Sequence, residues 1–276
     1  EKFFIVALVI LCISVSETLA QRNNQLNQKF ALAQQLEKQG EFAKALVFYK
    51  EVYEAQPTNN TYFTKVRRML ENLKMYDEWI RYINEGLQKK RDDVTLLGEY
   101  AKAHYYQGKI DIAYNTWDSI IDLNPGAEFN YRTVAQLQQS VRLYDDAIGI
   151  LLLGREKLNN PLAFANELAN IYQYRQEYKL ATREFLNMVN VNPSFQKMVE
   201  QIINGFPQDS TIVADVTGEL EKVVADSSLN ANFRRLLSGF YIKNKDYDKA
   251  FSSYILLDSL LKANGTELFG FADQLY

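Results

Sequence analysis

The segment GEFAKALVFY, residues 40–49, decides the fold because its spacing recurs along the chain. In it, Phe42 stands three residues before the small Ala45. Equivalent pairs follow at intervals of 34 residues, namely Tyr76/Trp79, Ile110/Ala113, Tyr144/Ala147 and Tyr178/Ala181. After a gap of two periods plus one residue, the pattern returns at Tyr247/Ala250. A fixed period of this length predicts an array of stacked repeats.

One repeat, residues 26–57, shows what each unit contains. Apolar residues at helical spacing predict a first helix over residues 26–39 and a second over 42–55. Gly40 lies between them, where a residue of positive φ ends a helix. Pro57 prevents continuation of the second helix. Each unit is therefore predicted to be an antiparallel helix hairpin.

These residues resemble the tetratricopeptide repeat family. The resemblance rests on Gly40, Phe42, Ala45 and Tyr49 with Ala33 and Pro57 around them, and on the third and fifth units: Ala101, Gly108, Ala113, Trp117 and Pro125, then Ala169, Tyr178, Ala181, Phe185 and Pro193. It spans residues 26–264 and implies an all-α, right-handed α-solenoid of stacked antiparallel helix hairpins. We expect about seven helix-pair units over residues 22–264, of which the sixth is irregular. Residues 265–276 are expected to form the first helix of a truncated eighth unit.

Small side chains explain physically why such hairpins stack. Alanines at corresponding positions of the two helices let their backbones approach closely: Ala33, Ala101, Ala135 and Ala169 on first helices, and Ala45, Ala113, Ala147, Ala181 and Ala250 on second helices. A single hairpin cannot bury its apolar face, so neighbouring units must cover it.

Two units depart from the pattern. In the second repeat, Arg67 and Trp79 replace the two alanines, which predicts a splayed helix pair. Either the Arg67 guanidinium stacks on the Trp79 indole and compensates for the change, or the solenoid bends there and shapes a site. In the sixth, a longer turn over 207–210 with Asp209 or Ser210 as N-cap explains the extra residue, and Gly218 falls inside the second helix.

Composition excludes some classes of function. The 276 residues are 47 % hydrophobic and 24 % charged, as in ordinary folded proteins. Lys and Arg total 31 against 34 Asp and Glu, and the pI is near 5.5. A general nucleic-acid binder normally carries a basic surface, so no nucleic-acid partner is expected.

The N-terminal segment predicts export. Lys2 precedes an apolar run over 3–13, and small or polar residues follow up to Ala20, as in a secretory signal peptide over residues 1–20. The run is short for a membrane span, although an uncleaved anchor is the alternative. Removal of this segment would remove Cys12, the one cysteine. An exported chain without disulfides suits a bacterial envelope, so we expect an exported bacterial member, periplasmic or outer-membrane associated.

Catalytic and metal-binding motifs are lacking in the sequence. The lone histidine, His104, falls on a packing face, and Cys12 lies in the leader, so neither a zinc site nor a catalytic base is expected. The acidic pairs Asp77-Glu78 and Asp145-Asp146 begin second helices, where they complement the helix dipole. No phosphate loop or nucleophile elbow occurs. We expect no enzyme, no metal and no small-molecule cofactor.

First helices of such arrays line a concave groove. Between the packing positions they carry amides interspersed with Arg, Lys and Tyr, which can bond a peptide backbone and form contact hot spots. The predicted groove residues are Gln34, Arg68, Asn72, Lys102, Tyr105, Tyr106, Arg132, Gln136, Gln139, Asn166, Asn170, Gln173 and Tyr174. Some family members clamp a C-terminal carboxylate with Lys and Asn, but Phe30 and Gln34 occupy the relevant positions here, so that ligand is not expected.

The leading hypothesis is a non-enzymatic protein–protein interaction scaffold in the bacterial cell envelope, binding a protein or peptide segment in its groove. One alternative is the docking or regulatory part of a longer enzyme or signalling protein, because the sequence starts at Glu1 and stops within a repeat pattern at Tyr276. A third hypothesis is glycan or cell-wall binding through Tyr105, Tyr106 and Tyr174.

Overall fold

The structure is a computed structural model that describes residues 21–226 and 230–275. The expected signal peptide, residues 1–20, lies outside the described residues. Within the described ranges the chain is helical and carries no strand. None of the helices described there is both long and apolar enough to cross a membrane.

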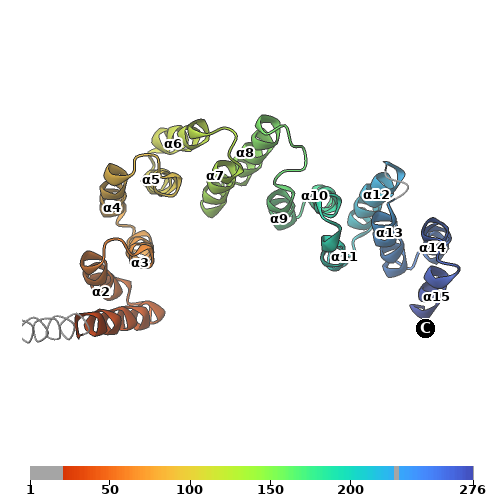
Figure 1. Ribbon diagram of the computed structural model, residues 1–276, viewed down its shortest axis with the longest axis horizontal. Helices are drawn as coiled ribbons and strands as arrows, with labels where there is room; N and C mark the ends of the chain where they lie inside the picture. The colour runs from red at the N-terminus through yellow and green to blue at the C-terminus, as the bar shows by residue number, and fades with distance from the viewer. Residues whose placement is uncertain (1–20, 227–229, 276) are drawn as a thin grey trace, which may run out of the picture. The chain divides into compact units, whose positions relative to one another are not determined.

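The chain divides after Leu123 into two compact units. In the first, residues 21–38 are helical. They are followed by α2 (Phe42–Ala55), α3 (Asn60–Asn72), α4 (Tyr76–Lys89), α5 (Val94–Tyr106) and α6 (Ile110–Leu123) (Figure 1).

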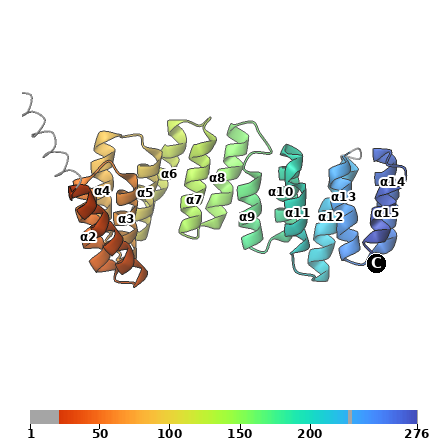
Figure 2. The same ribbon diagram turned by 60° about the horizontal axis from the view of Figure 1, so that its bottom comes forward.

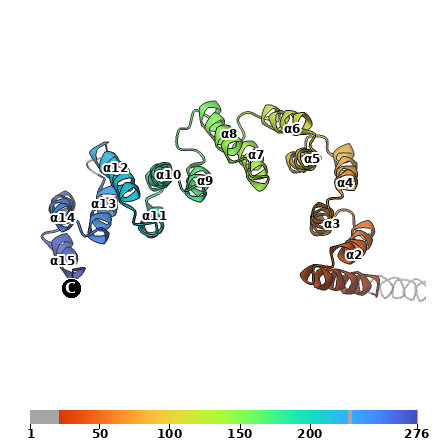
Figure 3. The same ribbon diagram turned by 180° about the vertical axis from the view of Figure 1, so that it is seen from behind.

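The second unit continues the alternation of helices from Asn124. Neighbouring helices such as α7 and α8 run side by side (Figure 2), and α13 packs against both α12 and α14 (Figure 3). Its elements are α7 (Glu128–Ser140), α8 (Tyr144–Lys157), α9 (Ala165–Tyr174), α10 (Tyr178–Val191), the 3-10 turn η1 (Pro193–Phe195), α11 (Gln196–Asn204), α12 (Ser210–Asp226), α13 (Ala231–Lys243), α14 (Tyr247–Leu261) and α15 (Thr266–Asp273).

The helix boundaries repeat the sequence period. Second helices begin at the predicted anchor residues Phe42, Tyr76, Ile110, Tyr144 and Tyr178. The residues that follow the first helices have a left-handed backbone in six hairpins, whereas Gly205 after α11 has a φ of −80°. Gly40 and Gly108 supply it without a Cβ, at φ 79° and 78°. Lys74, Arg142, Gln176 and Lys245 adopt it as non-glycine residues. The turn therefore keeps its left-handed geometry in the repeats that have no glycine at this position.

The predicted small-residue crossings are confirmed. All nine alanines named above are buried, and the larger residues one turn beyond the second-helix alanines are buried with them, namely Tyr49, Trp117, Leu151, Phe185 and Tyr254. The prediction of an all-α solenoid of stacked antiparallel helix hairpins is confirmed by this packing and by the helix order.

Ion pairs show that the hairpins stack in two layers within each unit. First helices are joined to first helices, as in Lys102–Glu71 (2.8 Å) and Arg235–Glu267 (2.7 Å). Second helices are joined to second helices, as in Lys50–Glu78 (2.7 Å) and Arg183–Glu219 (2.8 Å). Each such pair spans about one period, so a charged residue in one repeat fixes the position of the next.

The splayed second hairpin is also confirmed. The backbones of α3 and α4 approach one another at far fewer positions than those of α5 and α6 or of α7 and α8. Trp79 is fully buried between them. The guanidinium of Arg67 forms an ion pair with Glu99 of α5, in the next hairpin, where a stack on Trp79 was one expectation.

The irregular sixth hairpin follows the expected outline. A turn between Gly205 and Asp209 separates α11 from α12, and the Asp209 carboxylate accepts a hydrogen bond from the backbone N–H of Thr211 (2.8 Å). Asp209, not Ser210, is therefore the N-cap. Gly218 is exposed on α12, with open space where a side chain would lie.

Candidate functional site

The predicted groove residues belong to the first-helix layer of the two units. Gln34, Arg68, Asn72, Lys102, Tyr105 and Tyr106 lie in the first unit, and Arg132, Gln136, Gln139, Asn166, Asn170, Gln173 and Tyr174 lie in the second. All of them are exposed or half-buried. The two sets form separate candidate surfaces.

In the first unit, most charged and aromatic members of the set are engaged with their neighbours. Arg68 approaches Glu37 at 3.3 Å, and Lys102 pairs with Glu71 at 2.8 Å. Tyr106 stacks on Tyr76 with the ring centroids 5.6 Å apart. Burial, assisted by the charge of Glu71, raises the pKa of Tyr106 above its ordinary value. This surface is largely satisfied internally.

In the second unit, the side-chain amides of α7 and α9 are more available to a ligand than the guanidinium of Arg132. Arg132 donates from Nε to Glu167 (2.5 Å) and also approaches Glu128 (3.3 Å). Asn170 donates to Asn166 at 3.3 Å, and both are exposed. Tyr174 is 69 % exposed, with its ring 5.0 Å from that of Tyr144. The face of α7 and α9 therefore offers amide groups and one projecting aromatic ring, whereas Arg132 already has carboxylate partners.

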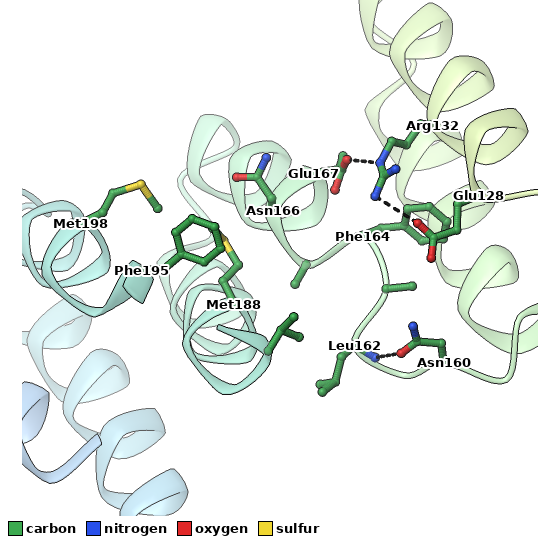
Figure 4. A pocket seen from close by; sticks show the side chains of 13 residues that line it. Glu128, Arg132, Asn160, Leu162, Phe164, Asn166, Glu167, Met188, Phe195 and Met198 are labelled. Carbon is green, nitrogen blue, oxygen red and sulfur yellow. Dashed lines mark hydrogen bonds and ion pairs between the residues drawn. The ribbon is translucent and has the colours of Figure 1, made fainter. Parts of the chain in front are cut away.

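Beside this face lies an apolar hollow of about 520 Å³ (Figure 4). One side is formed by the start of α7, the loop before α9 and the first residues of α9. The other side is formed by the end of α10, η1 and α11. Phe195 and Met198 point into it, and the ion pair of Arg132 with Glu167 lies on its rim (Figure 4). Of the predicted groove residues, it brings together only Arg132 and Asn166.

The hollow lies where α9 lacks its first turn. The first helices α3, α5 and α7 begin at Asn60, Val94 and Glu128, so the period sets the next start at residue 162, but α9 begins at Ala165. The chain before it turns through Phe164, whose φ is 59°. The Phe164 ring is buried against Tyr131 and beneath the Arg132 guanidinium, at centroid distances of 6.0 and 5.4 Å.

Sequence reasoning missed this hollow and its apolar residues Leu162, Val191, Phe195 and Met198. The period alone predicts a regular helix start at residue 162. The one available signal was Pro161 after Asn159 and Asn160, a combination that favours turns. Nothing in a single sequence shows that Phe164 turns inward and leaves the hollow open.

His104 is a packing residue, as the sequence predicted. It is 5 % exposed on α5, with its ring edge-on to Tyr100 at 4.3 Å. Burial, assisted by the positive charge of Lys109, lowers the pKa of His104 below the ordinary 6.5. Among the described residues, no group of three His, Cys, Asp or Glu side chains is placed to hold a metal ion.

This lowered pKa gives a testable pH dependence of stability. Between the folded-state pKa and about 6.5 the unfolded chain binds more protons, so the protein should lose stability as the pH falls through that window. We expect the difference in Tm between pH 7.5 and pH 5.0 to be smaller in His104→Leu than in the native protein. Thermal unfolding followed by circular dichroism measures it. An identical pH dependence in both would contradict the assignment to His104.

The chain is distantly similar to three solved tetratricopeptide repeat proteins. No family model and no curated protein matches the sequence. A tetratricopeptide repeat protein from Parabacteroides merdae is 15 % identical, with a TM-score of 0.36 over 85 % of this chain and 93 % of its own. The C-terminal part of a TPR repeat-containing protein from Cytophaga hutchinsonii is 15 % identical and has a TM-score of 0.36. The match covers 87 % of this chain and 98 % of that one.

A thermophilic TPR protein from Thermus thermophilus is 14 % identical, with a TM-score of 0.37 over 71 % of this chain and 98 % of its own. Similarities this low carry no information about a ligand. The tetratricopeptide-like fold is established by the structure's own helix pairs and by their period of 34 residues.

Proposed function

We propose that the protein is a non-enzymatic interaction scaffold that binds a protein segment on the first-helix face of α7 and α9. The observation that carries the proposal is the set of exposed and half-buried amides on these helices, beside the projecting ring of Tyr174. Amide groups can both donate to and accept from a peptide backbone, and exposed tyrosines are favoured at contact hot spots.

The internal ion pairs refine how binding would occur. Because Arg132 is paired with Glu167 and Glu128, the amides and Tyr174 carry the recognition, and an acidic ligand is not favoured. Export to a bacterial envelope is part of the proposal, on the strength of the sequence of residues 2–20 alone.

The test is affinity capture from a bacterial envelope extract, with captured proteins quantified by mass spectrometry. In Asn170→Ala/Tyr174→Ala, we expect at least a fivefold loss of a partner that the native protein captures. The matched control is Asn115→Ala/Tyr247→Ala, which removes an exposed amide and an exposed tyrosine from second helices. Unchanged capture by the first variant, or equal loss in the control, would contradict the proposal.

A further inference from the structure

The rim of the hollow carries an unbalanced negative charge. The charged groups among its lining residues are the carboxylates of Glu128 and Glu167 and the single guanidinium of Arg132. Arg132 donates to Glu167 at 2.5 Å, whereas its distance to Glu128 is 3.3 Å. The Glu128 side chain is 44 % exposed. Glu128 and Glu167 therefore share one guanidinium, which leaves one net negative charge to attract a cation from outside.

Apart from the amides of Asn160 and Asn166, the rest of the lining is apolar. Leu162, Ala163, Phe164 and Ala165 form one wall, and Met188, Val191, Phe195 and Met198 form the other. Val191 is 62 % exposed, and Phe195 and Met198 are also accessible. Burying accessible apolar surface of this kind stabilises a complex by roughly 25 cal/mol for each Å² removed from water.

The size of the hollow matches the structural element that α9 lacks. A helix about 10 Å across rises 5.4 Å per turn, so one turn occupies roughly 400 Å³. The hollow of about 520 Å³ can accept one such turn with its apolar side chains. Apolar residues four apart on a helix lie on the same face, so two of them can enter together.

We propose that this hollow binds a short helical protein segment with two apolar side chains one turn apart and a Lys or Arg beside them. The apolar pair fills the space between Leu162 and Met198, and the cation pairs with Glu128. The inference goes beyond the proposed function, because it names a second binding place and the chemistry of the segment bound there. It differs from that function in using the hollow and not the amide face.

A random dodecapeptide display library, selected on the whole protein, provides the probe. Enriched peptides should share an apolar pair spaced by three or four residues and a neighbouring Lys or Arg. One such peptide, synthesised with a fluorescein label, should bind Val191→Gln/Met198→Gln at least tenfold more weakly than the native protein in fluorescence anisotropy. Glu128→Lys should weaken it similarly, and should improve binding of the same peptide with Glu in place of its cation.

The control variant is Val47→Gln/Ile112→Gln, which makes the same change at two comparably accessible residues on second helices of the first unit. It should bind the peptide as the native protein does. Enrichment of acidic peptides, no enrichment, or equal weakening in the control would overturn the inference. Displacement of the peptide by dodecanoate at similar concentration would overturn it in favour of a lipid chain.

The two proposals can fail separately. If Asn170→Ala/Tyr174→Ala loses the captured partner but the hollow selects no such peptide, the scaffold function stands and the inference about the hollow is wrong. If peptide binding depends on the hollow but capture is insensitive to the amide face, the proposed binding face is wrong.

Discussion

Arg155→Ala is expected to lower the free energy of unfolding by about 3–5 kcal/mol. The Arg155 guanidinium bonds Glu184 through both terminal nitrogens, at 2.9 and 2.5 Å. It also donates from Nε to the backbone oxygen of Ala163 at 2.6 Å. The side chains of Arg155 and Glu184 are only 13 % and 8 % exposed, so the substitution leaves a buried carboxylate without its counter-charge.

Urea unfolding followed by circular dichroism measures this loss. Arg81→Ala is the matched control, because Arg81 pairs with Glu78 at 3.1 Å but is 60 % exposed, and such pairs contribute about 0–1 kcal/mol. Replacing the whole pair, as Arg155→Met/Glu184→Leu, should restore most of the stability, because apolar residues of similar volume leave no unpaired charge. A loss no larger for Arg155→Ala than for Arg81→Ala would show that the pair is not structurally important.

Gly154→Ala is expected to destabilise the protein by about 1–3 kcal/mol, although alanine is the better helix former. A Cβ on Gly154 would lie 2.7 Å from Cε2 of Phe164 and 2.9 Å from Cγ of Tyr131. Both rings are buried, so neither can move away without disturbing the loop before α9. The glycine therefore allows Phe164 to pack beside α8.

The same helix supplies the control. Gly149→Ala places a Cβ where nothing lies within 4 Å, so it should stabilise the protein by about 0.5–1 kcal/mol. Phe164→Leu, which shortens the obstructing side chain, should reduce the additional cost of Gly154→Ala when the two are combined. Stabilisation by Gly154→Ala alone, measured by the same urea unfolding, would show that the rings can move apart.

Much of the fold was predictable because it is set by local, repeated chemistry. The start of each second helix followed from Phe42, Tyr76 and their equivalents, and close packing followed from the alanines. The splaying of α3 and α4 followed from Arg67 and Trp79, because two large side chains cannot fit where two alanines cross. The compensation expected for Arg67 was a stack on Trp79, whereas its ion-pair partner is Glu99, in the next hairpin.

The candidate site was predicted less completely. The amides of α7 and α9 were found because their positions alternate with packing positions at helical spacing. The sequence did not show that Lys102 and Arg132 were already paired, because Glu71 and Glu167 belong to neighbouring repeats. The apolar hollow arises from one absent helical turn and one inward-facing ring, and a period offers no sign of either.

By itself, the sequence determined the period, the hairpins and the residue types on each helix face, because these depend on contacts a few residues apart. The tertiary structure decided which charged side chains pair with one another and where an apolar hollow remains between the helices. Those properties depend on contacts between side chains about one repeat apart, because the packing of one hairpin on the next determines which of these side chains touch.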